Sequence, residues 1–253
     1  MPMNTKNNDH VSAVRNAMKV LRELANNYEL GITQLSDLVG LPKSTVFRLV
    51  RTLLDEQLVE QNPDSRKYRL GLVALVIGSA AYRHTDLGNE VVPYLMRLSR
   101  RMPGVVRLGI YDHGYVLYLY KTPDNKDTVT YSGFGRRVPA YCTAIGKVLL
   151  AYQPITECEQ ALSGPLTRLT ANTVVDQSVL EEQLATIREQ GYAVTYGERK
   201  SGFYSVAVPL FGTEARVESA ISITGPRTWF PAGGHEIVWE LQNLARDLGM
   251  IAH

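Results

Sequence analysis

The sequence predicts an α+β chain in which a small helical domain ending in a hairpin precedes a larger domain, an antiparallel sheet flanked by helices. Between residues 11 and 54, apolar side chains recur at helical spacing, and two short strand-like segments follow them. After residue 104 the period changes to two, in the order hairpin, strand, helices, three strands, helix. The 253 residues, 45% of them apolar, exceed one average domain, so two domains are expected.

Composition and charge narrow the expected class and cellular compartment of the protein. The net charge is only +2, and residues 1–72 hold ten Lys/Arg and eight Asp/Glu, against seventeen of each in the remainder. This balance argues against a surface coated with cations but permits a local basic patch. Cys142 and Cys158 show no framework spacing, the first ten residues are polar, and the apolar run 70–82 is too short for a bilayer. We therefore expect a soluble cytoplasmic protein without a signal peptide or a membrane span.

Two helices are expected at the start of the chain. The apolar face of the first, from Val11, consists of Val14, Ala17, Met18, Leu21, Leu24 and Ala25. The second is expected to have its N-cap at Thr33 and to end at Gly40, where a left-handed residue can stop a helix. Its predicted buried face consists of Leu35, Leu38 and Val39.

The third helix carries the strongest functional signal. Pro42 suits its first turn, and its predicted buried stripe consists of Val46, Leu49, Val50 and Leu53. Its predicted exposed face consists of Lys43, Ser44, Phe47, Arg48 and Arg51, and no acid lies between residues 42 and 54. Cations and hydroxyls suit phosphates and base edges, and an exposed Phe47 suits a thymine methyl in the major groove. We expect a recognition helix, after a turn at Gly40.

A hairpin follows this helix. Strands at residues 58–61 and 66–70 are joined by Asn62, Pro63, Asp64 and Ser65, which together form a strong turn signal. As a wing, the hairpin would place Arg66, Lys67 and Tyr68 against sugar and phosphate beside the groove. The alternative is an ordinary solvated helix pair and hairpin, which can imitate this arrangement. The predicted DNA-contacting residues are Thr33, Gln34, Lys43, Ser44, Thr45, Phe47, Arg48, Arg66, Lys67 and Tyr68.

Residues 72–88 are expected to link the two domains. The segment GLVALVIGSAAYRH predicts a helix that is apolar nearly all round and must be covered on several sides. A second subunit would cover it, and so would packing between the two domains of one chain; both arrangements remain open. The small residues Gly78, Ser79, Ala80 and Ala81 permit close approach of another backbone. The expected boundaries are 10–71, 72–88 and 89–253, with the polar segment 85–89 at the second junction.

The second domain is expected to begin with a helix capped by Asn89, with Pro93 near its first turn. VVRLGIYD and YVLYLYK then predict a hairpin that turns at His113 and Gly114, and a further strand is expected near residues 128–131. A loop and a helix beginning at Thr143 come next.

The remainder of this domain starts with residues 156–175, which carry no clear pattern. Ser178 and Glu181 predict a capping box for a helix that stops at Gly191. Three strands, near residues 192–196, 204–211 and 217–224, and a last helix ending at Gly249 complete the antiparallel arrangement.

Segments along nearly the whole chain resemble the IclR family of bacterial transcription regulators. They are SAVRNAMKVLREL, GITQLSDLVGLPKSTVFRLVRTL and YRLG in the first domain, and GRRVPAYCTAIGKVLLA, REQGYAVTYGE, GFYSVAVP and SITGP in the second. The resemblance implies a winged helix-turn-helix that binds a pseudo-palindromic operator in double-stranded DNA. It also implies a linker helix involved in dimerisation and a GAF-like domain that binds a small-molecule effector. We expect a homodimer or homotetramer that represses a catabolic operon, although the residues do not distinguish repression from activation.

Two positions depart from the pattern of the family. Ser205 stands where many members have a cysteine, which makes a thiolate metal site there doubtful. Arg107 stands where the family often has a small hydroxyl residue or a histidine, which changes the charge of the expected pocket.

The effector is expected to be a small organic or sugar acid. The first-turn amides of the helix beginning at Thr143 have no intrahelical acceptors and favour a carboxylate, and Gly146 would leave room for close approach. Small and hydroxyl side chains alternate with apolar ones along two strands, so one strand face is hydroxylic. Alternatively that face is simply wet. With positions implied by the resemblance, the predicted effector-binding residues are Val129, Thr143, Ala144, Ile145, Gly146, Thr195, Phe203, Ser205, Ser222 and Thr224, and Arg107 or Arg136 could add charge.

An enzyme is the alternative function. Cys142 lies near a helix N-terminus, where a thiolate is stabilised, and His113 or His84 could serve as its base. However, no Cys and His fall in a recognised local pattern, and the five histidines lack the spacing of metal ligands. A pure assembly module would leave the third helix unexplained. We expect neither catalysis nor a metal or other cofactor.

Overall fold

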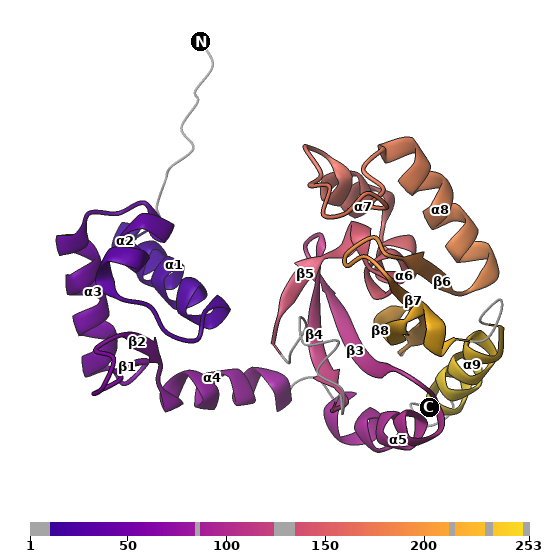
Figure 1. Cartoon of the computed structure of the whole chain (residues 1–253), viewed down its shortest axis with the longest axis horizontal. Coiled ribbons are helices and arrows are strands. Elements are labelled where there is room, and N and C mark those ends of the chain that lie inside the picture. Colours follow the sequence, from indigo (N-terminus) through magenta and orange to yellow (C-terminus); the bar gives the residue numbers. More distant parts are fainter. Residues whose placement is uncertain (1–10, 84–86, 124–134, 213–215, 231–234, 250–253) are drawn as a thin grey trace, which may run out of the picture. The chain divides into compact units, whose positions relative to one another are not determined.

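The computed structural model describes residues 11–83, 87–123, 135–212, 216–230 and 235–249. The chain divides into two compact units, Met1–Thr85 and Asp86–His253, drawn in indigo to magenta and in magenta to yellow in Figure 1. Helices and antiparallel strands occur in both, so the α+β prediction is confirmed. The division between the units falls within the segment expected to be the linker.

The first unit is a three-helix domain with a hairpin and an outgoing helix. In chain order its elements are α1 (Ser12–Asn26), α2 (Ile32–Val39), α3 (Lys43–Asp55), β1 (Val59–Gln61), β2 (Tyr68–Leu70) and α4 (Leu72–Arg83). Its core joins all three helices to the hairpin, through Val20, Leu24, Leu30, Leu35, Val46, Val50, Leu53, Val59 and Tyr68. The chain between α2 and α3 turns at Gly40, whose left-handed φ of 67° ends α2 as predicted.

Some details of the first two helices differ from the prediction. Helix α2 begins at Ile32 with Gly31 as its N-cap, so Thr33 lies in the first turn and the predicted cap was wrong. The reason is Gln34, whose Oε1 accepts the Gly31 amide at 3.0 Å. Leu38, predicted to be buried, is exposed. In α1 the apolar face predicted from Val14 to Ala25 is rotated, because Val20 and Leu24 are buried whereas Val14, Met18 and Ala25 are exposed.

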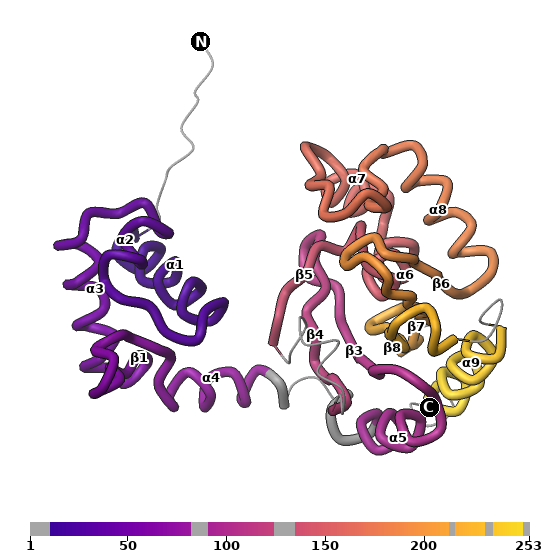
Figure 2. The backbone as a smooth tube through the Cα atoms, viewed as in Figure 1, coloured from indigo at the N-terminus to yellow at the C-terminus, as the bar shows by residue number. Residues whose placement is uncertain are grey.

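The second unit is built on one sheet. In chain order its elements are α5 (Leu87–Arg101), β3 (Val105–Asp112), β4 (Tyr115–Lys121), β5 (Arg137–Pro139), η1 (Ala140–Cys142), α6 (Ala144–Ala151), α7 (Ile155–Leu162), α8 (Gln177–Gln190), β6 (Ala193–Tyr196), β7 (Phe203–Phe211), β8 (Val217–Pro226), η3 (Arg227–Trp229) and α9 (His235–Gly249). The six strands have the order β5-β4-β3-β8-β7-β6, and every neighbouring pair is antiparallel. The tube in Figure 2 follows this curled sheet through the unit.

Helices cover both faces of the sheet. Helices α6 and α8 share a core with one face, to which Ala193, Ala207 and Ala220 contribute. Helices α5 and α9 pack on the other face, against β3 and β7 (Figure 1). Because side chains alternate along a strand, neighbours such as Val206 and Ile221 face away from α6. Small side chains toward α6 leave room there for a helix and a cavity.

Several predicted features of this unit are confirmed. Strands β3 and β4 have the predicted bounds, and the turn between them uses positive φ at both His113 (44°) and Gly114 (79°). Helix α6 has Thr143 as its N-cap, and α8 ends at Gly191 with a left-handed φ of 77°. The strand expected near residues 128–131 lies outside the described residues.

Other predictions for this unit were wrong. Helix α5 begins at Leu87, so Asn89 lies inside it instead of capping it. Helix α8 is capped by Asp176, whose Oδ1 accepts the Val179 amide at 3.2 Å. Ser178 is not the cap, because it is the second residue of α8, and its hydroxyl donates to the same Asp176 oxygen at 2.6 Å. The short elements β5, η1 and α7 were not predicted.

Candidate functional site

The candidate functional side chains lie on two surfaces and in one cavity. On α3, Val46, Val50 and Leu53 are buried, which turns the opposite face to solvent. The residues exposed there are Lys43, Ser44, Phe47, Arg48 and Arg51, as predicted, and Thr45 is half-buried. Thr33 and Gln34 are exposed on α2. These placements give one helix face with three cations, an aromatic ring and a hydroxyl, the groups that phosphates and base edges require.

The wing is held by a carboxylate from the segment between α1 and α2. Glu29 Oε2 accepts hydrogen bonds from Asn62 Nδ2 and Ser65 Oγ, both at 3.0 Å. This fixes the turn beside Arg66, which is exposed and has a φ of 59°, a strained value for a residue other than glycine. Lys67 is half-buried.

Tyr68 does not belong to the exposed tip of the wing. Its side chain is only 8% exposed in the core of the first unit, and its backbone exchanges hydrogen bonds with Leu30. Tyr68 is therefore a core residue of the domain, which favours a structural role over the predicted contact with sugar and phosphate.

Helix α4 exposes an apolar face. Leu72, Leu75, Val76 and Ile77 are each more than half exposed. Four large aliphatic side chains in one and a half turns form a patch of the kind that marks an interaction surface. Among the described helices none is long and apolar enough to cross a membrane.

The cavity lies in the second unit, between the α6 face of the sheet and the N-terminus of α6, and has a volume of about 420 Å³. Predicted effector-binding residues meet in its lining: Thr143, Ala144, Ile145, Thr195, Phe203, Ser205, Ser222 and Thr224. The other lining residues are Arg107, Tyr118, Cys142, Leu169, Gly197, Glu198, Arg199 and Lys200. Val129 lies outside the described residues, and Arg136 is exposed and absent from the lining.

Strand register explains the polar wall of the cavity. Ser205 pairs with Thr195 on one side and with Thr224 on the other, so three hydroxyls lie in one row across β6, β7 and β8. Ser205 Oγ and Thr224 Oγ1 are 2.7 Å apart. Arg107 lies in the next row, opposite Ser222.

Arg107 is only 3% exposed, and its guanidinium carbon lies 5.9 Å from the centre of the Tyr118 ring. Burial raises the pKa of Tyr118, and the charge of Arg107 opposes that shift. The sequence did not predict where the Arg107 side chain lies. In the structure it is a buried cation in the cavity wall.

The opposite wall is the first turn of α6. The first intrahelical bond runs from the Lys147 amide to the Thr143 carbonyl, so the Ala144 and Ile145 amides precede the helical ladder. The Gly146 amide donates to Thr143 Oγ1 at 3.0 Å. Gly146 is absent from the lining, and a Cβ there would lie 2.1 Å from the Ala140 carbonyl oxygen. The expectation that Gly146 makes room for a ligand was therefore wrong, because the Ala140 backbone occupies that room.

Cys142 lines the cavity but is only 1% exposed. Burial raises the pKa of its thiol to about 11, although Arg199 opposes the shift. A thiol with this pKa is protonated at neutral pH and is a poor nucleophile. Among the described residues, no group of three or more His, Cys, Asp or Glu side chains could hold a metal ion.

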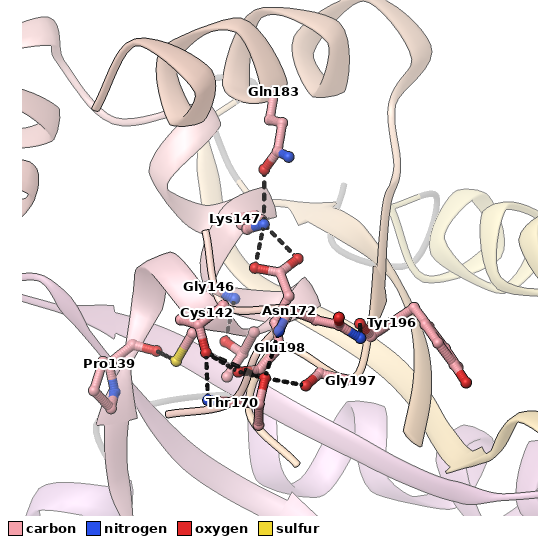
Figure 3. A network of polar contacts seen from close by, with 12 residues as sticks. Pro139, Cys142, Gly146, Lys147, Thr170, Asn172, Gln183, Tyr196, Gly197 and Glu198 are labelled. Carbon is pink, nitrogen blue, oxygen red and sulfur yellow. Dashed lines mark hydrogen bonds and ion pairs between the residues drawn. The ribbon is translucent and has the colours of Figure 1, made fainter. Parts of the chain in front are cut away.

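A buried ion pair adjoins the cavity (Figure 3). Lys147 Nζ lies 2.6 and 2.7 Å from the two carboxylate oxygens of Glu198 and 2.7 Å from Gln183 Oε1 on α8. Burial lowers the pKa of Lys147, and the Glu198 charge opposes that shift. Sequence reasoning missed this pair. The available signal was a single lysine in the otherwise apolar helix AIGKVLLA, since a buried cation needs a partner.

The loop that carries Glu198 is also held through its backbone. Thr170 Oγ1 donates to the Gly197 carbonyl and Thr173 Oγ1 donates to the Glu198 carbonyl, both at 2.6 Å. Asn172 Nδ2 donates to the Tyr196 carbonyl at 3.2 Å (Figure 3). The segment with no clear sequence pattern thus fixes one wall of the cavity.

Known proteins match both units of the chain. Residues 13–63 match the IclR helix-turn-helix domain, and residues 79–250 match the model described as bacterial transcriptional regulator IclR C-terminal. The HTH-type transcriptional regulator XynR of Escherichia coli K12 is 37% identical over 217 residues, which cover 85% of this chain and 86% of that protein. The HTH-type transcriptional regulator KdgR of Dickeya chrysanthemi is 34% identical over 245 residues, or 96% and 80% of the two chains.

Solved structures give the same result. An IclR transcriptional regulator from Alicyclobacillus acidocaldarius has a TM-score of 0.82 at 25% identity and covers 96% of this chain and 100% of that one. An IclR homologue from Microbacterium hydrocarbonoxydans, complexed with 4-hydroxybenzoate, has a TM-score of 0.80 at 25% identity and covers 95% and 98%. With both domains matched in order, the chain belongs to the IclR family of bacterial transcriptional regulators.

Proposed function

We propose that this regulator represses a catabolic operon, that α3 and the wing bind its operator, and that a small organic acid bound in the cavity controls it. The observation that carries the proposal is the cavity itself. It joins the N-terminus of α6, a row of hydroxyls and the buried Arg107 in one space of about 420 Å³. A cavity of this size suits a small metabolite.

Charge favours an acid over a neutral ligand. Among the described lining residues three carry a positive charge, Arg107, Arg199 and Lys200, and one carries a carboxylate, Glu198, which is paired with Lys147. The Ala144 and Ile145 amides at the positive end of α6 add to this field. The Microbacterium homologue, which was crystallised with 4-hydroxybenzoate, supports an organic acid. In the proposed complex the carboxylate lies at the α6 N-terminus and hydroxyls of the ligand face Ser205, Ser222 and Thr224.

Calorimetry tests the ligand class. The panel contains gluconate, 2-oxoglutarate and 4-hydroxybenzoate, each with its neutral amide. The double variant Ser222→Ala/Thr224→Val removes two hydroxyls from the lining and keeps similar side-chain volumes. We expect an acid to bind most tightly, and the double variant to bind it about tenfold more weakly because two hydrogen bonds are lost. Tightest binding of an amide, or equal affinity of the double variant, would contradict the proposal.

The predicted roles of Arg48 and Lys67 in DNA binding can be distinguished by experiment. Arg48 is exposed one turn after Ser44 on α3, so Arg48→Ala should relax specificity at one base step by roughly 1–3 kcal/mol, as for a bidentate contact with guanine. Lys67 is on the wing, so Lys67→Ala should weaken binding to all sequences alike and lower the dependence on salt. Gel shifts with operator and random DNA at several salt concentrations measure both effects. Equal losses on both DNAs for the two variants would show that the roles are wrongly assigned.

We further propose that two chains pair through the apolar face of α4. Two recognition helices related by a two-fold axis would match a pseudo-palindromic operator. The exposed Leu72, Leu75, Val76 and Ile77 support this arrangement, because a second copy would remove them from water.

A further inference from the structure

The proposed function does not explain how a cavity that binds an acid tolerates the carboxylate of Glu198, which is paired with Lys147, in its wall. Glu198 lines the cavity, whereas Lys147 does not and lies behind it on α6. The two side chains are 8% and 2% exposed, so solvent screens neither charge effectively. An unpaired carboxylate in this wall would repel an anionic ligand strongly, because like charges at low local dielectric interact over several ångströms.

We infer that Lys147 determines the specificity of the cavity for anions, because it neutralises Glu198 from behind the wall. The inference rests on the proposed acidic effector and adds the residue that makes an acid acceptable. Both Glu198 oxygens face the Lys147 ammonium, at 2.6 and 2.7 Å, so the pair carries no net charge.

The backbone around Glu198 is held by hydrogen bonds that do not involve Lys147. Thr170 and Thr173 hold the carbonyls of Gly197 and Glu198, each at 2.6 Å. Removal of the ammonium should therefore change the charge of the wall more than its shape. Lys147 is thus a positioning and neutralising residue, and its loss should affect anions and neutral ligands differently.

The test is the ratio of acid to amide affinity, measured by calorimetry on the full chain. The probe is whichever of gluconate, 2-oxoglutarate and 4-hydroxybenzoate binds the wild type most tightly, together with its amide. Lys147→Met should lower the ratio roughly tenfold or more, the effect of one buried charge at close range. Glu198→Gln should keep or raise the ratio, and Lys147→Met/Glu198→Gln should restore at least the wild-type value. Lys19→Met, the same change on an exposed lysine of α1, should leave the ratio unchanged.

The outcomes separate the possible errors. If the wild type binds an amide better than every acid, the proposed function fails, whatever the variants do. If the wild type prefers an acid but Lys147→Met weakens acid and amide equally, Lys147 has only a structural role and the inference is overturned. A lower ratio in Glu198→Gln, or a double variant that stays as low as Lys147→Met, overturns it as well. Should Lys147→Met fail to fold, Glu198→Gln and the double variant still decide, because neither leaves an unpaired carboxylate and each is compared with the wild type. A ratio below the wild-type value in either variant then overturns the inference.

Discussion

Replacement of Gly146 with alanine should destabilise the second unit by about 3 kcal/mol, near the upper end for overpacked cores. An added Cβ would lie 2.1 Å from the Ala140 carbonyl oxygen, 2.4 Å from the Ala140 Cα and 2.6 Å from its carbonyl carbon. Because real Cβ atoms essentially never come closer than 3.0 Å, α6 and η1 must separate by about 0.9 Å. Every residue of both elements is buried, so no flexible side chain can absorb that shift. The helix propensity of alanine returns only about 1 kcal/mol.

Urea unfolding of the full chain, followed by circular dichroism, measures this loss. Gly249→Ala is the matched control, because Gly249 ends α9 in the same unit and an added Cβ would meet nothing within 4 Å. Its stability should stay within about 0.5 kcal/mol of the wild type. If Gly146→Ala unfolds at the same urea concentration as the control, the close approach of η1 and α6 is not rigid and the packing argument is refuted.

Three further predictions concern other parts of the molecule. Val76→Glu places a charge on the exposed apolar face of α4. This variant should abolish both the proposed dimers and operator binding while the second unit stays folded. An unchanged mass in sedimentation, together with intact operator binding, would exclude this interface. Burial raises the pKa of the Cys142 thiol to about 11. In a Cys158→Ser background, the rate of Cys142 alkylation by iodoacetamide should therefore rise about tenfold per pH unit from pH 7 to 10. A plateau of this rate near pH 8 would contradict the burial argument. Ser219 Oγ is fully buried without a hydrogen-bond partner among the described residues. Ser219→Ala should therefore raise the free energy of unfolding by up to about 1 kcal/mol. A clear loss of stability in urea unfolding would reveal a missed partner.

Patterns that extend over many residues were predictable from the sequence. The hairpin from Val105 to Lys121 was predicted with its bounds because alternation on both strands and the His–Gly turn point to one register. The faces of α3 were predicted because the buried stripe at Val46, Val50 and Leu53 repeats at helical spacing.

Features that depend on single contacts were not predictable. Gly31 and Asp176 cap their helices instead of the nearby Thr33 and Ser178, because one hydrogen bond decides between neighbouring candidates. Glu198 meets Lys147 across 51 positions of sequence, and no local pattern encodes that distance. Arg107 could be placed only when the β3–β8 register put it opposite Ser222.

The complete burial of α6 makes the two walls of the cavity unequal in their tolerance of change. All eight of its residues, from Ala144 to Ala151, are buried, so a substitution that reshapes the ligand contact on this helix also disturbs the core. The strand wall includes two small side chains, Ser205 and Thr224, that are only half-buried and can be enlarged or shrunk with less disturbance. A regulator of this build can acquire a new effector by altering its sheet while α6 keeps its place, and directed evolution for a new effector should accumulate its changes on β7 and β8.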